Sequence, residues 1–242
     1  MTKHFIILSS SYSLGARIAI HYLIDKKSTV DSLTDKVRRI KEMCGETVSI
    51  STHFIEAEGE DWESVVKSDA FFEGIYCCDS INDFIELIKT DRLLTAIDVA
   101  NYILCTIPCT HLKLEKLLYL CYAEYLCSTH KKLFKDQIYA FAYGPIIKTV
   151  FNKYKGQRWI AGSGKKAETR RLSAKSRILF ACDGIEKLEI IDRVIENYKG
   201  HTAAELVSLT HTLGGPWDVT DKSTSYAEIT DETILKHHCY EC

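Results

Sequence analysis

The sequence contains no apolar run that approaches the roughly 20 residues needed to cross a bilayer. It also has no excess of charge, since 31 Lys and Arg residues face 33 Asp and Glu residues, so the net charge points to neither nucleic acid nor a membrane as partner. The start, MTKHFIILSSSYS, lacks the cleavage site of a signal peptide. With 46% apolar residues, the composition predicts a globular cytoplasmic protein with ample material for a core.

Signature motifs of common catalytic sites are missing as well. The sequence has no G-x-S-x-G elbow, no H-E-x-x-H zinc motif, no kinase signature and no P-loop. Carboxylates are scattered over polar faces of the expected helices, where solvation accounts for them. We therefore predict no catalytic residues, no cofactor-binding residues, no metal ligands and no enzymatic activity.

Ten cysteines are many for a chain of this length. The chain is too long for a small disulfide-stapled fold and has no secretion signal, so a reducing cytoplasm is the better interpretation. The last six residues, HHCYEC, combine histidines with a C-x-x-C spacing that suits zinc, but no second such pair accompanies them. A flexible polar tail over residues 221–242 is the prediction, with a zinc site as the alternative.

The first ninety or so residues alternate strand-like and helix-like patterns. HFIILSS (4–10) and VSISTHFI (48–55) predict two strands. Helices are expected over residues 14–24, 31–43, 61–76 and 80–88, with Gly45 as a C-terminal cap. The simplest arrangement is a small α/β domain over residues 1–92, in which the two strands run parallel and the helices form the crossover.

One loop in this domain leaves a functional alternative open. The segment from Ser9 to Gly15 lies at an expected strand-to-helix junction, where helix N-termini can bind phosphate. Because it is neither G-x-G-x-x-G nor a P-loop, plain turn and capping chemistry is the preferred interpretation. The alternative is a nucleotide-binding or enzymatic N-terminal domain with a regulatory helical module behind it.

The second part of the chain is mainly helical in pattern. Thr95 and Asp98 fit a helix-start box, and we place the domain boundary just before them, without a linker. A buried helix face follows, formed by Leu114, Leu117, Leu118, Cys121 and Tyr125. Residues 138–143 predict a strand, which Tyr143-Gly144-Pro145 ends before a helix that starts at the proline.

The segment after that helix, residues 156–177, is rich in Lys and Arg. A solvated loop is the preferred interpretation, and a basic patch for nucleic acid or an acidic protein is the alternative. Nucleic acid is not favoured, because no helix-turn-helix or zinc finger accompanies the patch. Helices are then expected over residues 183–198 and from a second capping box at Thr202 and Glu205.

Five motifs occur in this part in a fixed order. They are KLEKLLYL (Lys113–Leu120), K-x-L-F-x-D-x-I-x-A (Lys131–Ala140), Tyr143-Gly144-Pro145, Thr210-His211 and Pro216-Trp217. A run such as LLYL is an ordinary helix face, but the ordered set resembles the Panacea domain of SocA/GepA-like antitoxins. The resemblance covers residues 93–220, about half of the chain, and leaves the first ninety or so residues out.

The resemblance implies an α+β protein: a mainly helical Panacea-like domain with a short β element, behind the α/β domain. It implies an antitoxin that binds and neutralises a cognate protein toxin, in one branch by delivery to a ClpXP-type protease. In the family, regions attached to the shared domain help to determine which toxin is bound. Residues 1–92 are therefore the expected specificity domain. Motif loops are the expected contact sites for the partner: Tyr143, Gly144, Pro145, His211, Pro216 and Trp217. Core packing is the alternative role for the aromatic residues.

Overall fold

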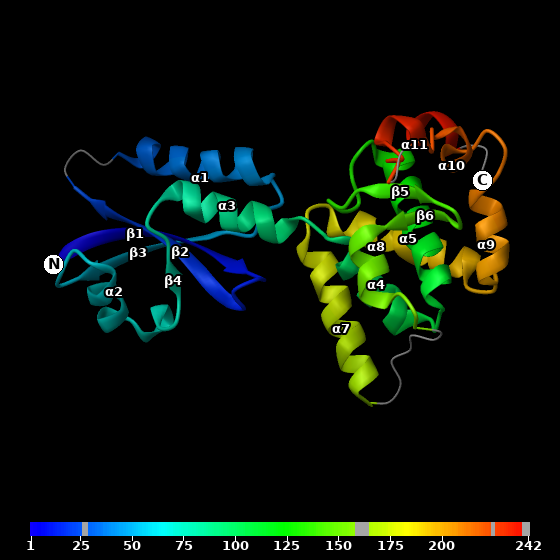
Figure 1. Cartoon of the computed structure of the whole chain (residues 1–242). Helices are drawn as coiled ribbons and strands as arrows, with labels where there is room; N and C mark the ends of the chain where they lie inside the picture. Colours follow the sequence, from blue (N-terminus) through cyan, green and yellow to red (C-terminus); the bar gives the residue numbers. More distant parts are fainter. Residues whose placement is uncertain (26–28, 158–164, 224–225, 239–242) are drawn as a thin grey trace. The chain divides into compact units, whose positions relative to one another are not determined.

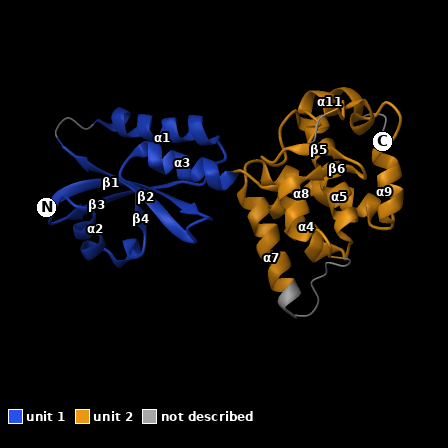
Figure 2. Cartoon of the chain, in the orientation of Figure 1, with its two compact units in different colours: residues 1–92 blue, residues 93–242 orange. Residues whose placement is uncertain are grey.

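The computed structural model describes residues 1–25, 29–157, 165–223 and 226–238, with the backbone alone for 165–167. The chain forms two compact units, residues 1–92 and 93–242, which we describe separately (Figure 2). Unit 1 is a four-stranded sheet with helices, and unit 2 is mainly helical with a β-hairpin (Figure 1). The predicted α+β class is confirmed. In the described part of the chain, no helix is both long and apolar enough to span a membrane.

Unit 1 is built on a sheet with strand order β3-β1-β2-β4. The strands β1, β2 and β3 pair antiparallel, and the two-residue β4 pairs parallel with β2. Helices α1 and α3 cover one face of the sheet, and α2 with the short 3-10 helix η1 covers the other (Figure 1). The bounds are β1 Thr2–Ser11, β2 Ala16–Ile24, α1 Val30–Cys44, β3 Ser51–Ala57, α2 Trp62–Ser68, η1 Ala70–Phe72, β4 Tyr76–Cys77 and α3 Ile81–Arg92.

The central strand β1 is apolar on both faces, which is why it lies in the middle of the sheet. Phe5 and Ile7 pack under α1 and α3, whereas Ile6 and Leu8 pack under α2 and η1. Successive side chains of a strand point to opposite faces, so one continuous apolar run fills two cores.

The helix expected over residues 14–24 is wrong, because this segment is strand β2. Gly15, with φ +60°, reverses the chain directly after β1, and β2 returns beside β1 as a hairpin. Ile18 and Ile20 then face one core and Ala19 the other. The parallel pair with a helical crossover is therefore also wrong. The C-terminal cap at Gly45 is confirmed by its φ of +93° and its bond to the Lys41 carbonyl.

Unit 2 is organised around α5, which is buried along nearly all of its length. The predicted capping box of Thr95 and Asp98 is confirmed and starts α4. Helices α4, α8, α9 and α11 and strand β6 pack against α5. The bounds are α4 Ala96–Thr106, α5 His111–Thr129, β5 Ile138–Phe141, β6 Gly144–Ile147, α6 Lys148–Tyr154, α7 Lys165–Phe180, α8 Gly184–Tyr198, α9 Ala203–Thr210, α10 Pro216–Val219 and α11 Asp231–His237.

The Tyr143-Gly144-Pro145 segment ends β5, as predicted, but the helix expected from Pro145 is wrong. Gly144 takes φ +96° and turns the chain, so residues 144–147 return as β6 beside β5. The proline therefore lies in a strand, and α6 begins only at Lys148. The outcome is a two-stranded hairpin in place of a single strand.

The basic segment differs from the solvated loop that we expected, although residues 158–164 lie outside the described residues. The described part after them is helix α7, which packs against α4 and α8. Arg177 is buried, donates to the Leu93 carbonyl at 2.6 Å and lies 3.4 Å from a carboxylate oxygen of Asp98. One cation of the supposed patch is thus used inside the unit.

The end of the chain also differs from a flexible polar tail. Ala227, Ile229 and Ile234 are buried in the core of unit 2. The segment forms backbone hydrogen bonds with β5, in which the Ala140 amide donates to Ala227 and the Ile229 amide donates to Ile138. The zinc alternative depended on Cys239 and Cys242, which lie outside the described residues.

Candidate partner-binding site

Four of the five sequence motifs meet in space, although they come from distant parts of unit 2, and the second reaches them through β5, where Ala140 pairs with Pro145. The first lies on α5, the third forms the turn and first residues of β6, and the last two lie at the end of α9 and the start of α10. We call the residues that make the contacts the motif cluster. It comprises Lys113, Glu115, Lys116, Gly144, Pro145, Thr210, His211, Pro216 and Trp217.

Two adjacent charged residues of α5 hold the outer edge of β6. The Lys116 ammonium donates to the Pro145 carbonyl at 2.6 Å, and the Ile147 amide donates to Glu115 Oε2 at 2.9 Å. Residues two apart on a strand turn their amides and carbonyls to the same edge. The two side chains therefore take the hydrogen-bonding place of a neighbouring strand and lock the hairpin to α5.

This contact is fully buried, since the relative exposure of both Glu115 and Lys116 is 0%. Burial lowers the pKa of Lys116 to about 7, against the opposing effect of Glu115. Burial raises the pKa of Glu115 to about 7, against the Ile147 amide and Lys116. His111 Nε2 lies 3.9 Å from the other Glu115 oxygen, and burial, then Lys116, lowers the pKa of His111. Loss of one member of such a cluster leaves the others poorly satisfied.

Gly144 lies where α5, the hairpin and α9 come closest. A Cβ at this position would lie 2.9 Å from both Lys116 Nζ and Thr210 Oγ1. Thr210 is fully buried and donates to the Val207 carbonyl. Glycine is therefore required at position 144 for two reasons. The backbone has a positive φ, and the neighbouring side chains leave no space for a Cβ.

Trp217 connects α10 to the β5–β6 hairpin through a hydrogen bond. Its indole nitrogen donates to the Phe141 carbonyl at 2.8 Å, and its ring lies 3.7 Å from the His211 ring between centroids. Burial is the main cause that lowers the pKa of His211, followed by Lys116 and Lys222. The His211 ring thus lies tilted against Trp217, and the THxxxxPW motif joins the end of α9 to α10 and β5.

Lys113 makes a separate set of contacts about one turn earlier on the same helix. Its ammonium donates to the Lys199 carbonyl at 2.7 Å and to the His201 carbonyl at 2.6 Å. These groups lie just after the last residue of α8, where helix carbonyls have no partner within the helix. Both lysines of the KLEKLLYL motif thus bind backbone carbonyls inside the unit.

Of the six residues expected to contact a partner, only Tyr143 is freely exposed, with a relative exposure of 70%. Gly144, Pro145 and Pro216 are buried, and His211 and Trp217 are partly buried. Leu213 was missed by sequence reasoning; it is 86% exposed and follows Thr210 by three residues. Because Gly144 and Thr210 are in contact, Tyr143 and Leu213 project from two loops that meet.

The Ser9–Gly15 loop, the basis of the nucleotide alternative, has a different structure from the one expected. It lies in and beside a β-hairpin turn and does not precede a helix. The Asp91 carboxylate accepts from the Ser11 hydroxyl and from the amides of Tyr12 and Ser13. A carboxylate already occupies the donors that a phosphate would need. Elsewhere in the described parts of the chain, no group of three or more His, Cys, Asp or Glu residues is arranged for a metal ion.

This arrangement defines a helical domain in which buried motif residues fix two loops, which expose Tyr143 and Leu213. Residues 114–218 match the family model described as Antitoxin SocA-like, Panacea domain. Antitoxin SocA of Caulobacter vibrioides (strain NA1000 / CB15N) is 30% identical over 115 residues, which are 47% of this chain and 60% of that protein. The match thus spans less than two thirds of the relative's length. No solved structure matches the chain.

Residues 114–218 therefore match the SocA-like Panacea domain of antitoxins, as the motifs predicted. The matched region begins at α5 and ends within α10, so it includes every residue of the motif cluster except Lys113. Unit 1 lies outside the match.

Proposed function

We propose that this protein is the antitoxin of a toxin–antitoxin system, and that it binds a cognate protein toxin and neutralises it. The observation that carries the proposal is the match of residues 114–218 to the SocA-like family model. The mechanism is occlusion of the toxin surface, with no reaction catalysed by this chain. The cytoplasm, where a toxin acts on its host, is the expected site of action.

The motif cluster supports a role as a rigid scaffold for binding. Its buried bonds fix the 142–143 turn and the 211–215 loop before any partner arrives, so little conformational entropy is lost on binding. The exposed side chains of Tyr143 and Leu213 are then available as contacts. Large apolar side chains that become desolvated carry most of the binding energy of an interface.

Unit 1 is suited to the choice of toxin. It has its own two cores on either side of its sheet and lies outside the family match. A separately folded unit can differ between relatives without disturbing the scaffold, so we assign it the role of specificity domain.

The test is co-expression of the chain with the product of the neighbouring reading frame. The proposal expects that product to stop growth alone and growth to resume when the full chain is present. The same experiment in a host without ClpP distinguishes the two modes of neutralisation. Rescue without ClpP indicates direct occlusion, and loss of rescue indicates delivery to the protease. A neighbouring product that is harmless, or toxic but not neutralised, contradicts the proposal.

A further inference from the structure

The outer edge of β3 is the longest open strand edge in unit 1. The order β3-β1-β2-β4 places β3 and β4 at the two edges, and β4 has only two residues. β3 has seven residues and pairs with β1 along its inner side. Within the described residues, no strand pairs with its outer side. Every second residue of β3 therefore directs its amide and carbonyl away from the sheet.

The β3 edge lacks the features that usually prevent pairing with another chain. Its sequence, STHFIEA, contains no proline and no lysine, and its single charged residue is Glu56. Glu56 lies 3.6 Å from Lys3 on β1, and both side chains remain more than half exposed. Natural edge strands of this length are normally blunted by Lys, Pro, a bulge or a covering element. A strand edge without these protective features is suited to pair with a strand of another chain.

Exposed aromatic rings flank this edge on both faces of the sheet. Phe54 is 66% exposed on the face of α1 and α3, with its ring 5.0 Å from that of Phe5. On the opposite face, the exposed Phe71 lies 5.2 Å from His53 of β3. A strand laid along β3 would cover both rings with its alternating side chains.

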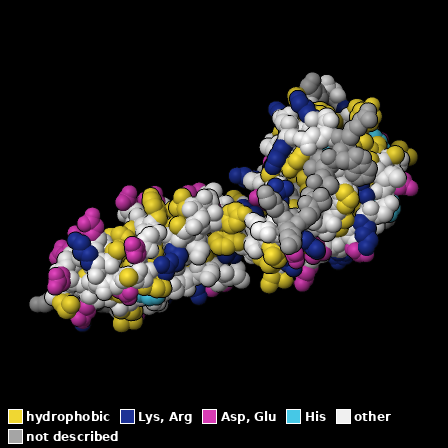
Figure 3. All heavy atoms as spheres, turned by 90° about the horizontal axis from the view of Figure 1, so that it is seen from below, with side chains coloured by type: hydrophobic (Ala, Val, Ile, Leu, Met, Phe, Trp, Pro, Cys, Tyr) yellow, Lys and Arg dark blue, Asp and Glu magenta, His cyan; other side chains and the backbone are white. Residues whose placement is uncertain are grey.

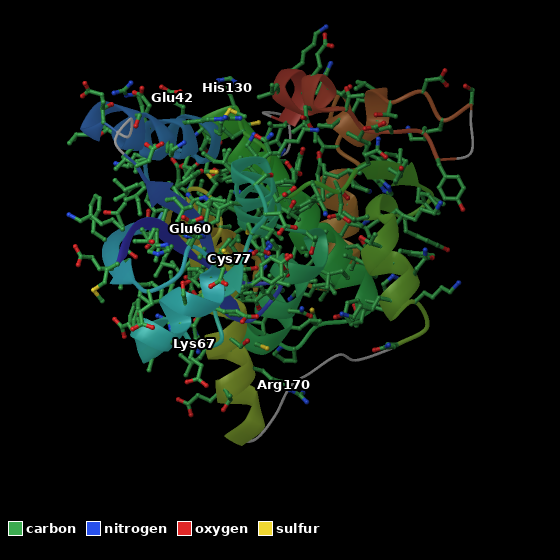
Figure 4. All side chains as sticks on the ribbon, turned by 90° about the vertical axis from the view of Figure 1, so that its left-hand side faces the viewer. Glu42, Glu60, Lys67, Cys77, His130 and Arg170 are labelled. Carbon is green, nitrogen blue, oxygen red and sulfur yellow. The ribbon has the colours of Figure 1, made fainter. Side chains whose placement is uncertain are left out.

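The charge beyond the end of β3 indicates what kind of segment fits. Residues 56–63 contain five acidic residues and no basic one: Glu56, Glu58, Glu60, Asp61 and Glu63, all exposed. Acidic side chains are prominent on this end of unit 1 in Figure 3, and Figure 4 shows Glu60 before α2 and Lys67 at its end. A hollow of about 620 Å³ opens here, and its charged lining consists of three acidic residues, Glu56, Glu58 and Asp61, with Lys67 and the amino-terminal Met1.

We propose that the β3 edge binds an extended segment of the toxin as an additional strand, and that Lys or Arg residues of that segment enter the acidic hollow. The inference rests on the proposed function, because it takes the toxin as the partner. Backbone bonds would supply affinity and the acidic hollow would supply selectivity, which is how strand addition usually works. It gives unit 1 a physical means of choosing a toxin.

A second copy of the chain fits this edge less well. Antiparallel pairing of two β3 strands would place the uncharged Ser51–His53 end opposite the acidic end. Parallel pairing would place the acidic ends together, where they repel. Neither arrangement brings a basic residue of β3 to the hollow, so charge complementarity favours a basic foreign segment.

A peptide experiment tests the edge without requiring the toxin. The probes are three peptides added to the full-length chain: alternating Val and Thr with Lys at both ends, the same core with Glu at both ends, and the Lys form with a central Pro. The readouts are fluorescence anisotropy and hydrogen exchange of the 51–57 amides. We expect the Lys form to slow exchange in β3 and to bind at least tenfold more tightly than either other peptide at low salt, with the preference over the Glu form reduced by salt.

A charge reversal with a matched control locates the selectivity. Glu58→Lys with Glu60→Lys should abolish the preference for the Lys form. Glu42→Lys with Glu86→Lys changes the same charge on the exposed sides of α1 and α3 and should leave the preference intact. Unchanged β3 exchange with the Lys form, equal binding of the Lys and Glu forms, or concentration-dependent protection of β3 without peptide would each overturn the inference.

The toxin provides an independent second arm. If the chain neutralises its toxin, complex formation should slow exchange in β3, and Glu58→Lys with Glu60→Lys should weaken the complex at least tenfold. Neutralisation without protection of β3 overturns the inference alone. Absence of a toxin contradicts the proposed function, while the peptides still decide whether the edge accepts a basic strand.

Discussion

The Lys116 ammonium donates a hydrogen bond of 2.6 Å to the Pro145 carbonyl, fully inside unit 2. A helix thus supplies the bond that a third strand would otherwise give to the hairpin. Glu115 completes the arrangement by accepting from Ile147. The pair explains why a helix motif and a turn motif more than twenty residues away in sequence belong to one structural device.

Removal of the Lys116 ammonium should loosen this contact. Lys116→Met keeps most of the side-chain volume but leaves the buried Pro145 carbonyl without its donor, which costs about 1–3 kcal/mol. Lys236→Met, at an exposed position on α11, is the control and should change the free energy of unfolding by less than about 0.5 kcal/mol. Urea unfolding measures both. Equal effects of the two substitutions would contradict the assigned role of Lys116.

Substitution of two glycines distinguishes the cost of backbone strain from the cost of a steric clash. Gly74 and Gly144 both have positive φ, +70° and +96°, but only at Gly144 does an added Cβ meet other atoms. We expect Gly74→Ala to cost about 1–2 kcal/mol from strain alone. Gly144→Ala should cost about 1–3 kcal/mol more, because it also displaces Lys116 and Thr210. Thermal and urea unfolding provide the comparison, and an equal cost at both positions would show that the close contact is unimportant.

The predicted inward face of α5 can be tested at Leu118. This side chain is fully buried, so Leu118→Ala should destabilise unit 2 by about 2–5 kcal/mol. Leu172 is exposed on α7, and Leu172→Ala should change stability by less than about 0.5 kcal/mol. A loss below about 0.5 kcal/mol for Leu118→Ala in denaturant unfolding would show that the core is wrongly assigned.

Unit 1 should lose stability in mild acid through a histidine pair. His4 Nε2 lies 3.1 Å from the Gly59 carbonyl, and His4 Nδ1 lies 2.7 Å from His21 Nε2. Burial, then His4, lowers the pKa of His21 below 6.5. The unfolded state therefore binds more protons there, and the contribution of His21 is lost as the pH falls through 6.5.

His21→Gln checks this pH dependence. Glutamine retains a donor for His4 but does not titrate, so the difference in stability between wild type and variant should be larger at pH 7.5 than at pH 5.5. Hydrogen exchange of the β1 amides at the two pH values reports on unit 1 specifically. A difference that does not vary with pH would contradict the assignment.

Unit 2 was largely predictable, because its elements carry strong local signals. The apolar face of α5 and the capping boxes at Thr95 and Thr202 each set a helix that the structure contains. Only the first strand and the turn of the hairpin could be predicted. A glycine before a proline marks a turn, but a proline starts a helix more often than it lies in a following strand.

Unit 1 was predicted less well, because strand β2 reads ARIAIHYLI. Its apolar residues are dense enough to satisfy both the helical and the strand period, and only pairing with β1 decides between them. The motif cluster shows the same limit. The motif residues were found, but Glu115 and Lys116 have a polar pattern that gives no sign of burial. The tertiary hydrogen bonds to β6 are what bring both charges inside.

The central claim is that the chain neutralises a protein toxin through the surface that the motif cluster fixes. The measurement is growth rescue from the co-expressed neighbouring gene product by Tyr143→Asp with Leu213→Asp. The control is Leu172→Asp with Ile185→Asp, which places the same charges on exposed apolar positions of α7 and α8. Urea unfolding must show that both double variants remain folded. We predict that the first loses rescue and binds the toxin at least a hundredfold more weakly, whereas the control behaves as wild type; a folded Tyr143 and Leu213 variant that rescues growth fully would contradict the claim.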